Sequence, residues 1–376
     1  MPSMTPVPLI SVCIPVYDTE PLLAQCLRSV IAQDFPDFEV VLVSDASRGK
    51  DEKGRTAKKI VKIMQKECDK SRSLRSLPKV PFRFLEHKEN RGLIEVRRSL
   101  CYEARGFYMT QLDSDDEMVE GALTALYAAA TEKAGIALGD TSVETSADIP
   151  GDREKLLSSS LDIVHGTSTA GYFDESGVFV PLKENRYGKI FYGEIEGREI
   201  FRRWILNGEF TANTWGKLIK RELWQKAYEN IPYTQCNMAD DVLLFFFLAQ
   251  YAKSYKGIPA KVYRYRVNTG MSSRRKIDSL HRWKMICSTA SVFSVISTWI
   301  NEKSQTELIM PDEIEQVRKM TRYYLRNNII QMKEVVVDEL KEKARAMLCD
   351  YWGTSFVEKI EAGLEADLAS QKAKSV

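Results

Sequence analysis

Residues 108–116 of this 376-residue chain read YMTQLDSDD, an apolar run that ends in three acidic side chains. The run has the composition of a buried β-strand, and Asp113, Asp115 and Asp116 follow its carboxyl end. Three carboxylates within four residues repel one another unless a cation lies between them. Mg²⁺ and Mn²⁺ prefer such oxygen ligands, so a metal site is one interpretation. The other is a solvated acidic turn at the start of the next helix, where Asp is favourable.

Residues 9–140 alternate between short strand-like runs and amphipathic helical runs. The strands are predicted at 9–16, 38–43, 82–86, 108–112 and 135–138, and the helices at 20–33, 53–69, 92–103 and 119–133. This alternation is typical of βαβ units and a mostly parallel sheet, which binds ligands beyond the carboxyl ends of its strands. The polar residues just past the strands are therefore predicted to share one rim. They are Tyr17, Asp18, Asp45, Asn90 and residues 113–116.

Composition excludes several classes of function. The net charge of +2 lacks the basic excess of a protein that binds nucleic acid by bulk electrostatics, so no nucleic-acid partner is expected. The seven cysteines form no CxxC pair and histidines number only three, which disfavours a zinc site and indicates a reducing, cytoplasmic compartment. No signal-peptide pattern begins the sequence, and the longest apolar run, 242–249, is too short to span a bilayer.

Four stretches in a fixed order carry a family resemblance. They read ISVCIPVYD at 10–18, FEVVLVSDAS at 38–47, NRGLIEVRR at 90–98 and DSDD at 113–116. Over residues 9 to about 130, this pattern resembles the family 2 glycosyltransferases of the GT-A fold. A looser match, NTWGKL at 213–218 followed by Asp240 and Asp241, extends it to about residue 250. The resemblance implies an α/β fold of GT-A type, with a Rossmann-like mixed, mostly parallel sheet flanked by helices.

The chain departs from the family pattern at four positions. Asp18 stands where Asn is usual, and Ser44 replaces the first residue of an Asp pair. Val96 stands where Ala commonly precedes the Arg, and Asp240 replaces the Glu of a Glu-Asp pair. None of these changes removes a group that the family's chemistry requires. The change at Ser44 leaves open which base is read.

The resemblance implies a role for each matched residue. Binding of a nucleotide-sugar donor would involve Pro15, Tyr17, Asp45, Asn90, Arg97, Asp113 and Ser114. Within this set, Asp45 would accept the imide N–H of a uracil-like base, and Arg97 would pair with the diphosphate or the base edge. The metal, Mn²⁺ or Mg²⁺, would be held by Asp115 and Asp116 and would neutralise the leaving nucleoside diphosphate. A UDP-sugar is the favoured donor.

The resemblance also implies the reaction. Asp241 would act as the general base that takes the proton of an acceptor hydroxyl, with inversion at the anomeric carbon. Trp215 and Asp240 would bind the acceptor, which is a glycan, a lipid-linked or a protein-linked saccharide. The alternative function is an inactive nucleotide-sugar-binding scaffold in a glycan-assembly complex. An NAD-dependent enzyme is disfavoured because no G-x-G-x-x-G follows the first strand.

The chain is predicted to form two domains. Residues 1–268 form the transferase domain, with a nucleotide-binding half at about 9–140, an insertion or lid-bearing loop at 141–196, and an acceptor-binding half at about 197–268. Residues 269–376 form a helical region whose amphipathic stretch, with Ile314, Val317, Met320 and Tyr324 at helical spacing, must cover something. It is expected to cover the transferase domain, a second copy in a homodimer, or a membrane at its cytoplasmic face. For the basic stretch 264–284, the resemblance implies closure over the diphosphate; peripheral contact with anionic lipid headgroups and a solvated face are the alternatives.

Overall fold

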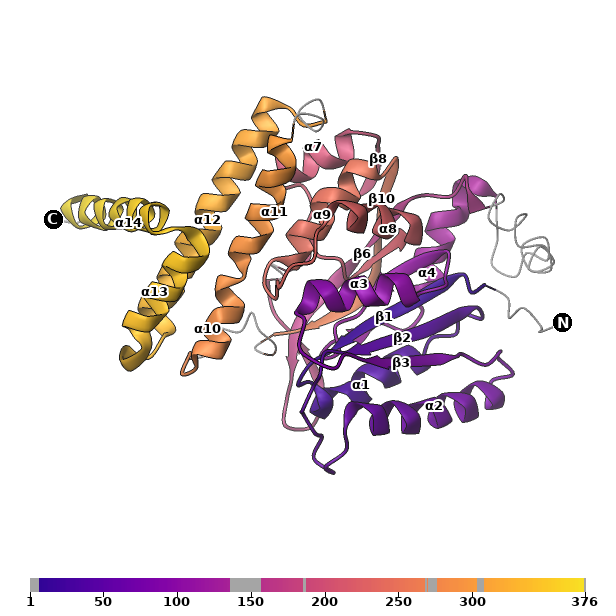
Figure 1. Ribbon diagram of the computed structural model, residues 1–376. Helices are drawn as coiled ribbons and strands as arrows, with labels where there is room; N and C mark the ends of the chain where they lie inside the picture. The colour runs from indigo at the N-terminus through magenta and orange to yellow at the C-terminus, as the bar shows by residue number, and fades with distance from the viewer. Residues whose placement is uncertain are drawn as a thin grey trace.

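The computed structural model describes residues 7–135, 157–184, 187–267, 269, 276–302 and 308–374. One mixed sheet has helices on both faces, and a helical C-terminal region lies beside it (Figure 1). The strands are β1 (Ile10–Val16), β2 (Phe38–Ser44), β3 (Phe82–Glu86), β4 (Tyr108–Gln111), β5 (Glu117–Met118), β6 (Ile163–Phe173), β7 (Phe179–Pro181), β8 (Gly193–Glu196), β9 (Lys217–Lys220) and β10 (Ser254–Arg266).

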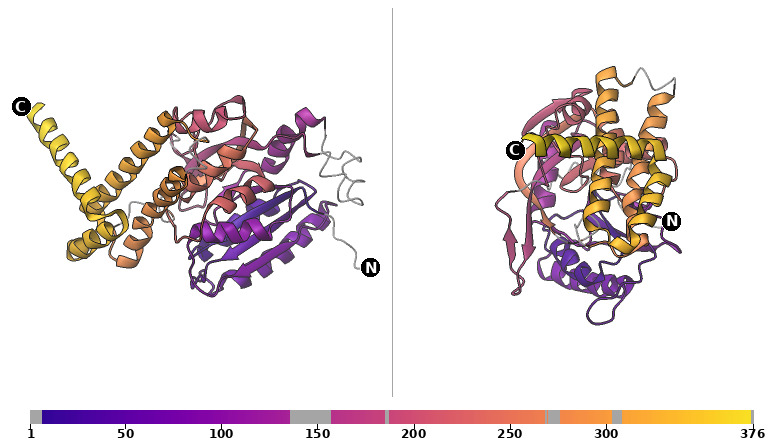
Figure 2. Two further views of the ribbon diagram at one scale, coloured as in Figure 1. Left: turned by 45° about the horizontal axis from the view of Figure 1, so that its top comes forward. Right: turned by 90° about the vertical axis from the view of Figure 1, so that its left-hand side faces the viewer.

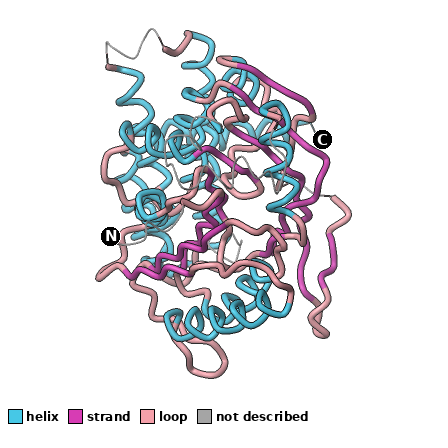
Figure 3. The backbone as a smooth tube through the Cα atoms, turned by 90° about the vertical axis from the view of Figure 1, so that its right-hand side faces the viewer, coloured by secondary structure: helices cyan, strands magenta, loops and turns pink. Residues whose placement is uncertain are grey.

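The helices of the described residues are α1 (Glu20–Ile31), α2 (Ala57–Leu74), α3 (Leu93–Glu103), α4 (Ala122–Thr131), α7 (Glu199–Ile205), α8 (Arg221–Asn230), α9 (Asp240–Tyr251), α10 (Leu280–Cys287), α11 (Thr289–Asn301), α12 (Pro311–Val335), α13 (Lys341–Trp352) and α14 (Thr354–Lys374), with short 3₁₀ turns η1 (Glu132–Ala134) and η4 (Asp338–Leu340). None of these helices combines the length and the apolar composition needed to cross a membrane. Helices lie on both sides of the strands in Figure 3.

The sheet has a parallel half and a mixed half. Its strand order is β3-β2-β1-β4-β9-β6-β10-β5, with β7 paired to β6 and β8 paired to β10. Strands β3, β2, β1 and β4 run parallel, whereas β9 is antiparallel to both of its neighbours. The predicted fold class, a mostly parallel sheet flanked by helices, is confirmed. The parallel half sets a rim of strand carboxyl ends on which a ligand site is expected.

Two hydrophobic layers cover the sheet. On one face, α1, α2 and α4 pack against the sheet, and on the other face α3, α7, α8 and α9 do so. Every residue of β1 and β2 is buried, because helices cover both faces of these central strands. Their mostly apolar sequences are therefore what makes both strands easy to predict.

The predicted insertion at 141–196 is wrong for its second half. Residues Ile163–Phe173 form β6, which lies between β9 and β10 inside the sheet. The stretch reads IVHGTSTAGYF, and its small and hydroxyl-bearing residues hide the pattern of a sheet strand. The predicted strand at 135–138 lies, apart from Gly135, outside the described residues, as do Arg274 and Arg275 of the basic stretch.

Helix α2 begins later than predicted because a side chain holds the preceding turn. Asp51 accepts hydrogen bonds from the backbone N–H groups of Lys53 (3.0 Å) and Arg55 (2.8 Å). Such a local side-chain-to-backbone turn competes with helix formation. The helix starts at Ala57 and continues to Leu74.

The C-terminal helices are divided between two cores. Helix α11 and the first half of α12 pack on the transferase domain through Phe293, Trp299 and Val317, among others. The rest of α12 joins α10, α13 and α14 around a separate core that includes Trp283 and Leu325. Helix α14 projects away from the body in the left-hand view of Figure 2. The face with Val317 therefore covers the transferase domain, the first of the three expected arrangements.

Candidate active site

A cavity of about 530 Å³ opens at the carboxyl ends of β1, β2 and β4. It collects side chains from strand ends, from the start of α9 and from the C-terminal helices. The predicted site residues that line it are Pro15, Tyr17, Asp45, Arg97, Asp113, Ser114, Asp115, Asp116, Trp215, Asp240 and Asp241. Asn90, which was predicted to bind the donor, is not among the lining residues.

Asp45 is buried and almost fully hydrogen bonded by the protein. Its Oδ1 accepts from the backbone N–H of Arg91 at 2.9 Å and lies 2.7 Å from His87 Nδ1. Its Oδ2 accepts from the N–H of Gly92 at 2.9 Å. A carboxylate oxygen offers about two lone pairs, so one acceptor position remains on Oδ2. His87 is held in turn by Ser99, whose Oγ lies 2.9 Å from Nε2.

Arg97 joins the two acidic segments of the cavity. The buried guanidinium donates through Nε to Asp240 at 2.8 Å and through Nη2 to Asp113 at 3.1 Å. Its Nη1 donates to Gln111 at 3.1 Å. These three hydrogen bonds use three of the five N–H groups of the guanidinium. Arg97 thereby fixes the acidic turn after β4 against the start of α9.

Burial and mutual repulsion shape the charges of these carboxyl groups. Burial and, to a lesser extent, the charge of Asp241 raise the pKa of Asp240 to about 6, against the attraction of Arg97. Burial raises the pKa of Asp113 as well, again opposed by Arg97. Six aspartates line the cavity, and Arg97 is the only cationic side chain among its described lining residues. The cavity as a whole favours a cationic occupant.

The two predicted metal ligands have different surroundings. Asp116 accepts hydrogen bonds from Tyr263 Oη at 2.8 Å and from the backbone N–H of Arg266 at 2.6 Å, one on each of its oxygens. Asp115 is half-buried, and its carboxylate has no hydrogen-bond or ion-pair partner in the described part of the chain. No three His, Cys, Asp or Glu side chains of the described residues are grouped so that they could hold a metal ion alone.

Asp241 lies at the start of α9 with one oxygen anchored. Its Oδ1 accepts from the Oγ1 of Thr214 at 2.8 Å and from the N–H of Thr214 at 3.2 Å. Its half-buried side chain lines the cavity. The preceding residue, Ala239, adopts a left-handed conformation with φ of 60°. For a non-glycine residue, this conformation costs about 1–3 kcal/mol, and such strain is concentrated at functional sites.

Trp215 belongs to a row of stacked aromatic rings. Its ring lies 4.6 Å from Tyr263 and 5.5 Å from Tyr265, and Tyr265 is 4.8 Å from Tyr187. Trp215 is only 6% exposed, whereas Tyr187 is 43% exposed. The ring of Trp215 is therefore engaged by the protein, which differs from the predicted stacking on a sugar. Tyr187 is the more accessible ring of this row.

Sequence reasoning missed several residues of the site. Tyr263 and Tyr265 alternate with arginines in the run YRYR, a strand pattern that places both tyrosines on one face. That pattern could have indicated their role. Met285 and Tyr324 also line the cavity, although they come from α10 and α12. No local pattern distinguishes these two from other residues on amphipathic helices.

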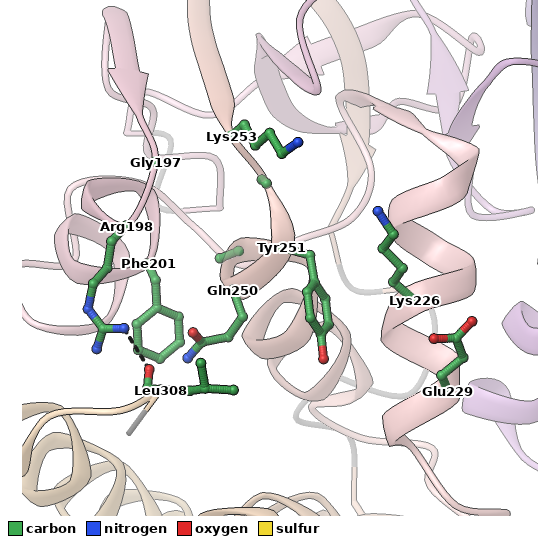
Figure 4. Close-up of a pocket in the computed structure, with 11 residues that line it drawn as sticks. Gly197, Arg198, Phe201, Lys226, Glu229, Gln250, Tyr251, Lys253 and Leu308 are labelled. Carbon is green, nitrogen blue, oxygen red and sulfur yellow. Dashed lines mark hydrogen bonds between the residues drawn. The ribbon is translucent and has the colours of Figure 1, made fainter. Parts of the chain in front are cut away.

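A second cavity of about 600 Å³ lies near the opposite end of α9. Its walls include Phe201, Lys226 and Gln250 (Figure 4). Arg198 at its edge donates to the carbonyl of Leu308 and to Glu313, so this charge serves a contact between helices. None of the predicted site residues lines this second cavity.

Comparison with known proteins agrees with the fold and with the acidic cavity at the ends of its strands. Residues 11–156 match the family model described as glycosyl transferase family 2. The similarity to this family thus lies in the N-terminal part of the chain. Over 142 residues the chain is 28% identical to the GalNAc(5)-diNAcBac-PP-undecaprenol beta-1,3-glucosyltransferase of Campylobacter jejuni. The aligned part is 38% of this chain and 41% of that protein.

Other similar proteins match a longer part of the chain at lower identity. Glycosyltransferase GlyA of Streptococcus pneumoniae is 23% identical over 268 residues, which covers 70% of this chain and 31% of that protein. The chain thus spans less than half the length of these curated relatives. The structure of Staphylococcus aureus TarS residues 1–349 aligns with a TM-score of 0.44 and 17% identity, over 94% of this chain and 91% of that one.

Proposed function

We propose that the protein transfers a sugar from a nucleotide-diphosphate donor, most favourably a UDP-sugar, to a hydroxyl of a saccharide acceptor with inversion of configuration. The observation that supports this proposal is that Asp45, Asp115 and Asp241 all line one cavity at the strand ends. They come from the end of β2, the turn after β4 and the start of α9. Each has an oxygen that the described residues leave available for one part of the substrates.

The base of the donor is assigned to the pocket around Asp45. The remaining acceptor position on its Oδ2 suits an imide N–H, which uracil and thymine carry and cytosine lacks. Pro15, near the end of β1, and Tyr17, just after it, lie on the same rim and line the space for base and ribose. A base without that N–H leaves the buried carboxylate with an unmet acceptor, which costs about 1–3 kcal/mol.

The diphosphate and its metal ion are assigned to Asp115. Mg²⁺ and Mn²⁺ commonly bind through one or two carboxylates and complete their shell with substrate phosphate oxygens, and the unpaired Asp115 fits that donor set. When bound, the ion neutralises charge on the leaving diphosphate. Asp116, with both oxygens engaged by Tyr263 and Arg266, is assigned to holding the turn. Ser114 fixes the same turn, because its Oγ lies 2.7 Å from Thr19 Oγ1.

Asp241 is assigned as the general base. It takes the proton of the acceptor hydroxyl while that oxygen forms a bond to the anomeric carbon and the bond to the diphosphate oxygen breaks. Attack opposite the leaving group inverts the configuration. The two hydrogen bonds from Thr214 orient the carboxylate and leave Oδ2 for the acceptor. The neighbouring Asp240 forms an ion pair with Arg97. Asp240 is therefore assigned to orienting the acceptor, and Asp241 to accepting the proton.

The acceptor is assigned to the saccharide class. The Campylobacter jejuni relative acts, by its name, on a glycan linked to undecaprenyl diphosphate. This name favours a lipid-linked acceptor over a free glycan or a protein-linked one. Because a lipid-linked acceptor is anchored in a membrane, the same assignment favours peripheral contact at the cytoplasmic face of a membrane.

A donor screen tests this function. The full chain is incubated with Mn²⁺, a mixture of methyl glycosides and UDP-, GDP- or dTDP-sugars, and released nucleoside diphosphate is measured. We expect metal-dependent release that is greatest with a UDP-sugar, and loss of release in Asp115→Asn. The matched control Glu120→Gln changes an exposed acid outside the cavity and should behave as wild type. Full activity of Asp115→Asn in EDTA would refute the metal role, and binding without turnover would favour the scaffold.

A further inference from the structure

The C-terminal helices complete the cavity on the side of the proposed base. Tyr324 of α12 and Met285 of α10 line it together with Asp240 and Asp241. Burial raises the pKa of Tyr324 to about 12, and the charges of the two aspartates act in the same direction. The hydroxyl therefore keeps its proton at neutral pH, and no hydrogen-bond partner is present for it among the described residues.

The position of this wall is fixed by contacts to the transferase domain. The ring of Tyr324 packs against Phe293 of α11 at 5.2 Å between centroids. Where α10 meets α11, the Oγ of Ser288 accepts a hydrogen bond from the N–H of Asn237 at 3.0 Å. The side chain of Asn237 in turn accepts from the N–H of Leu93 at 3.1 Å. The loop that precedes α9 is thus held between α3 and the C-terminal helices.

The charge on this side of the cavity limits what it can bind. Asp240 and Asp241 are acidic, and the guanidinium of Arg97 is occupied by Asp240, Asp113 and Gln111. Tyr324 offers a hydroxyl and an aromatic edge, and Met285 offers an adaptable apolar surface. A neutral sugar fits these groups, because its hydroxyls can pair with carboxylate and phenol while its C–H face contacts Met285. An anionic sugar would be repelled.

We propose that Tyr324 and Met285 form a subsite for a neutral saccharide acceptor, in which the Tyr324 hydroxyl donates to a sugar oxygen near the hydroxyl that Asp241 deprotonates. This inference deepens the proposed function and rests on it. It makes the C-terminal helices part of the acceptor site. Tyr324 is then an acceptor-binding residue, whereas the nucleotide contacts lie across the cavity at Asp45.

Saturation-transfer NMR on the full chain with UDP and Mn²⁺ tests the subsite. The probes are methyl β-glucoside, methyl β-galactoside, methyl N-acetyl-β-glucosaminide and methyl β-glucuronide. We expect saturable binding of at least one neutral glycoside and none of the glucuronide. Tyr324→Phe should weaken glycoside binding about tenfold, as loss of about 1.4 kcal/mol of hydrogen bonding implies, and Tyr324→Ala should abolish it. Tyr323→Phe is the matched control, because the neighbouring Tyr323 is 60% exposed.

The outcomes separate this inference from the function on which it rests. Calorimetry of UDP with Mn²⁺ should give equal affinity for wild type and all three variants. If none of UDP, GDP and dTDP binds the wild type, the proposed function fails. If UDP binds but no neutral glycoside does, or if the glucuronide binds as well as the neutral probes, the subsite alone is refuted. Unchanged glycoside affinity in Tyr324→Phe, with an unchanged melting temperature, also refutes it.

Discussion

In the proposed donor site, nucleotide selection rests on one free acceptor position of Asp45. The backbone of Arg91 and Gly92 and the ring of His87 already occupy the other acceptor positions of its carboxylate. This arrangement pre-orients Oδ2 and removes the freedom to turn toward a different hydrogen-bond pattern. The selectivity for an imide N–H should therefore be set in advance of binding.

Nucleotide affinities should reflect this arrangement. We expect UDP to bind at least about tenfold more tightly than CDP or ADP, because the lost hydrogen bond leaves an unpaired acceptor. Asp45→Asn should reduce the preference, and Glu89→Gln, which changes an exposed acid in the loop between β3 and α3, should keep it. Isothermal titration with Mn²⁺ present measures all three. Equal affinities for UDP, CDP and ADP would contradict the role of Asp45, and a preference for GDP would change the donor alone.

At this scale, the sequence could predict which residues reach the rim but not how each side chain is used. Pro15, Tyr17 and Asp45 follow apolar strands, and strand ends locate them directly. The partners of Arg97 and Asp116 could not be predicted in the same way. They depend on Asp240 and Tyr263, more than a hundred residues away in sequence, and on their precise approach in the folded protein.

Among the elements, α2 is fixed to the sheet by one buried arginine. Arg72 donates to the carbonyl oxygens of Phe35 at 3.1 Å and Gln33 at 3.3 Å, and also to that of Pro78. These carbonyls belong to the connections on either side of β2 and α2. The guanidinium therefore replaces the water that such loop carbonyls would otherwise bind.

Removal of this guanidinium should destabilise the protein without touching the cavity. We expect Arg72→Met to lower the free energy of unfolding by about 2–4 kcal/mol, because several buried carbonyls lose their donor. Arg28→Met should change it by less than about 0.5 kcal/mol, since Arg28 is an exposed residue paired only with Glu67. Urea unfolding measures both variants. A fall of less than about 1 kcal/mol in Arg72→Met would show that water replaces the guanidinium at little cost.

Element prediction succeeded where composition and burial agree. Strands β1 and β2 are continuously apolar and buried on both faces, so their sequences indicate their structure. Strand β6 is also central, but Thr167 and Ser168 are polar, and Gly166 lies so close to Val262 that a side chain would not fit there. Its place in the sheet follows from pairing with β9 and β10, which are distant in sequence.

For the whole molecule, the C-terminal helices are joined to the transferase domain by a buried acid. Glu313 of α12 is fully buried and bridges Arg198 at 2.6 Å and Arg202 at 3.1 Å. It lies at the N-terminus of α12, where negative charge is favourable. The apolar face of α11 and α12 packs beside it. Homodimer formation through the remaining surface of these helices and membrane contact stay predictions.

Loss of the Glu313 charge should loosen this attachment. We expect Glu313→Gln to lower stability by about 3 kcal/mol, because two arginines lose their shared buried partner. Glu315→Gln removes a half-buried acid two residues further along α12, whose partners are surface arginines, and should have an effect under about 0.5 kcal/mol. Thermal unfolding together with saturation transfer to methyl glycosides measures both. If the acceptor subsite depends on this attachment, Glu313→Gln should also weaken glycoside binding.

The central claim is that Asp241 takes the acceptor proton, and the transfer rate of Asp241→Asn tests it most directly. Asn keeps the size of the side chain and its hydrogen bond from Thr214 but cannot accept the proton. The account predicts a fall in sugar transfer from the preferred UDP-sugar of about 10²–10⁴-fold, with UDP affinity in Mn²⁺ unchanged. Asp240→Asn should be milder, since Asp240 pairs with Arg97 and is assigned to orienting the acceptor. A fall of less than about tenfold in Asp241→Asn, well under the usual effect of removing a base, would contradict the account. A larger effect for Asp240→Asn would identify Asp240 as the base.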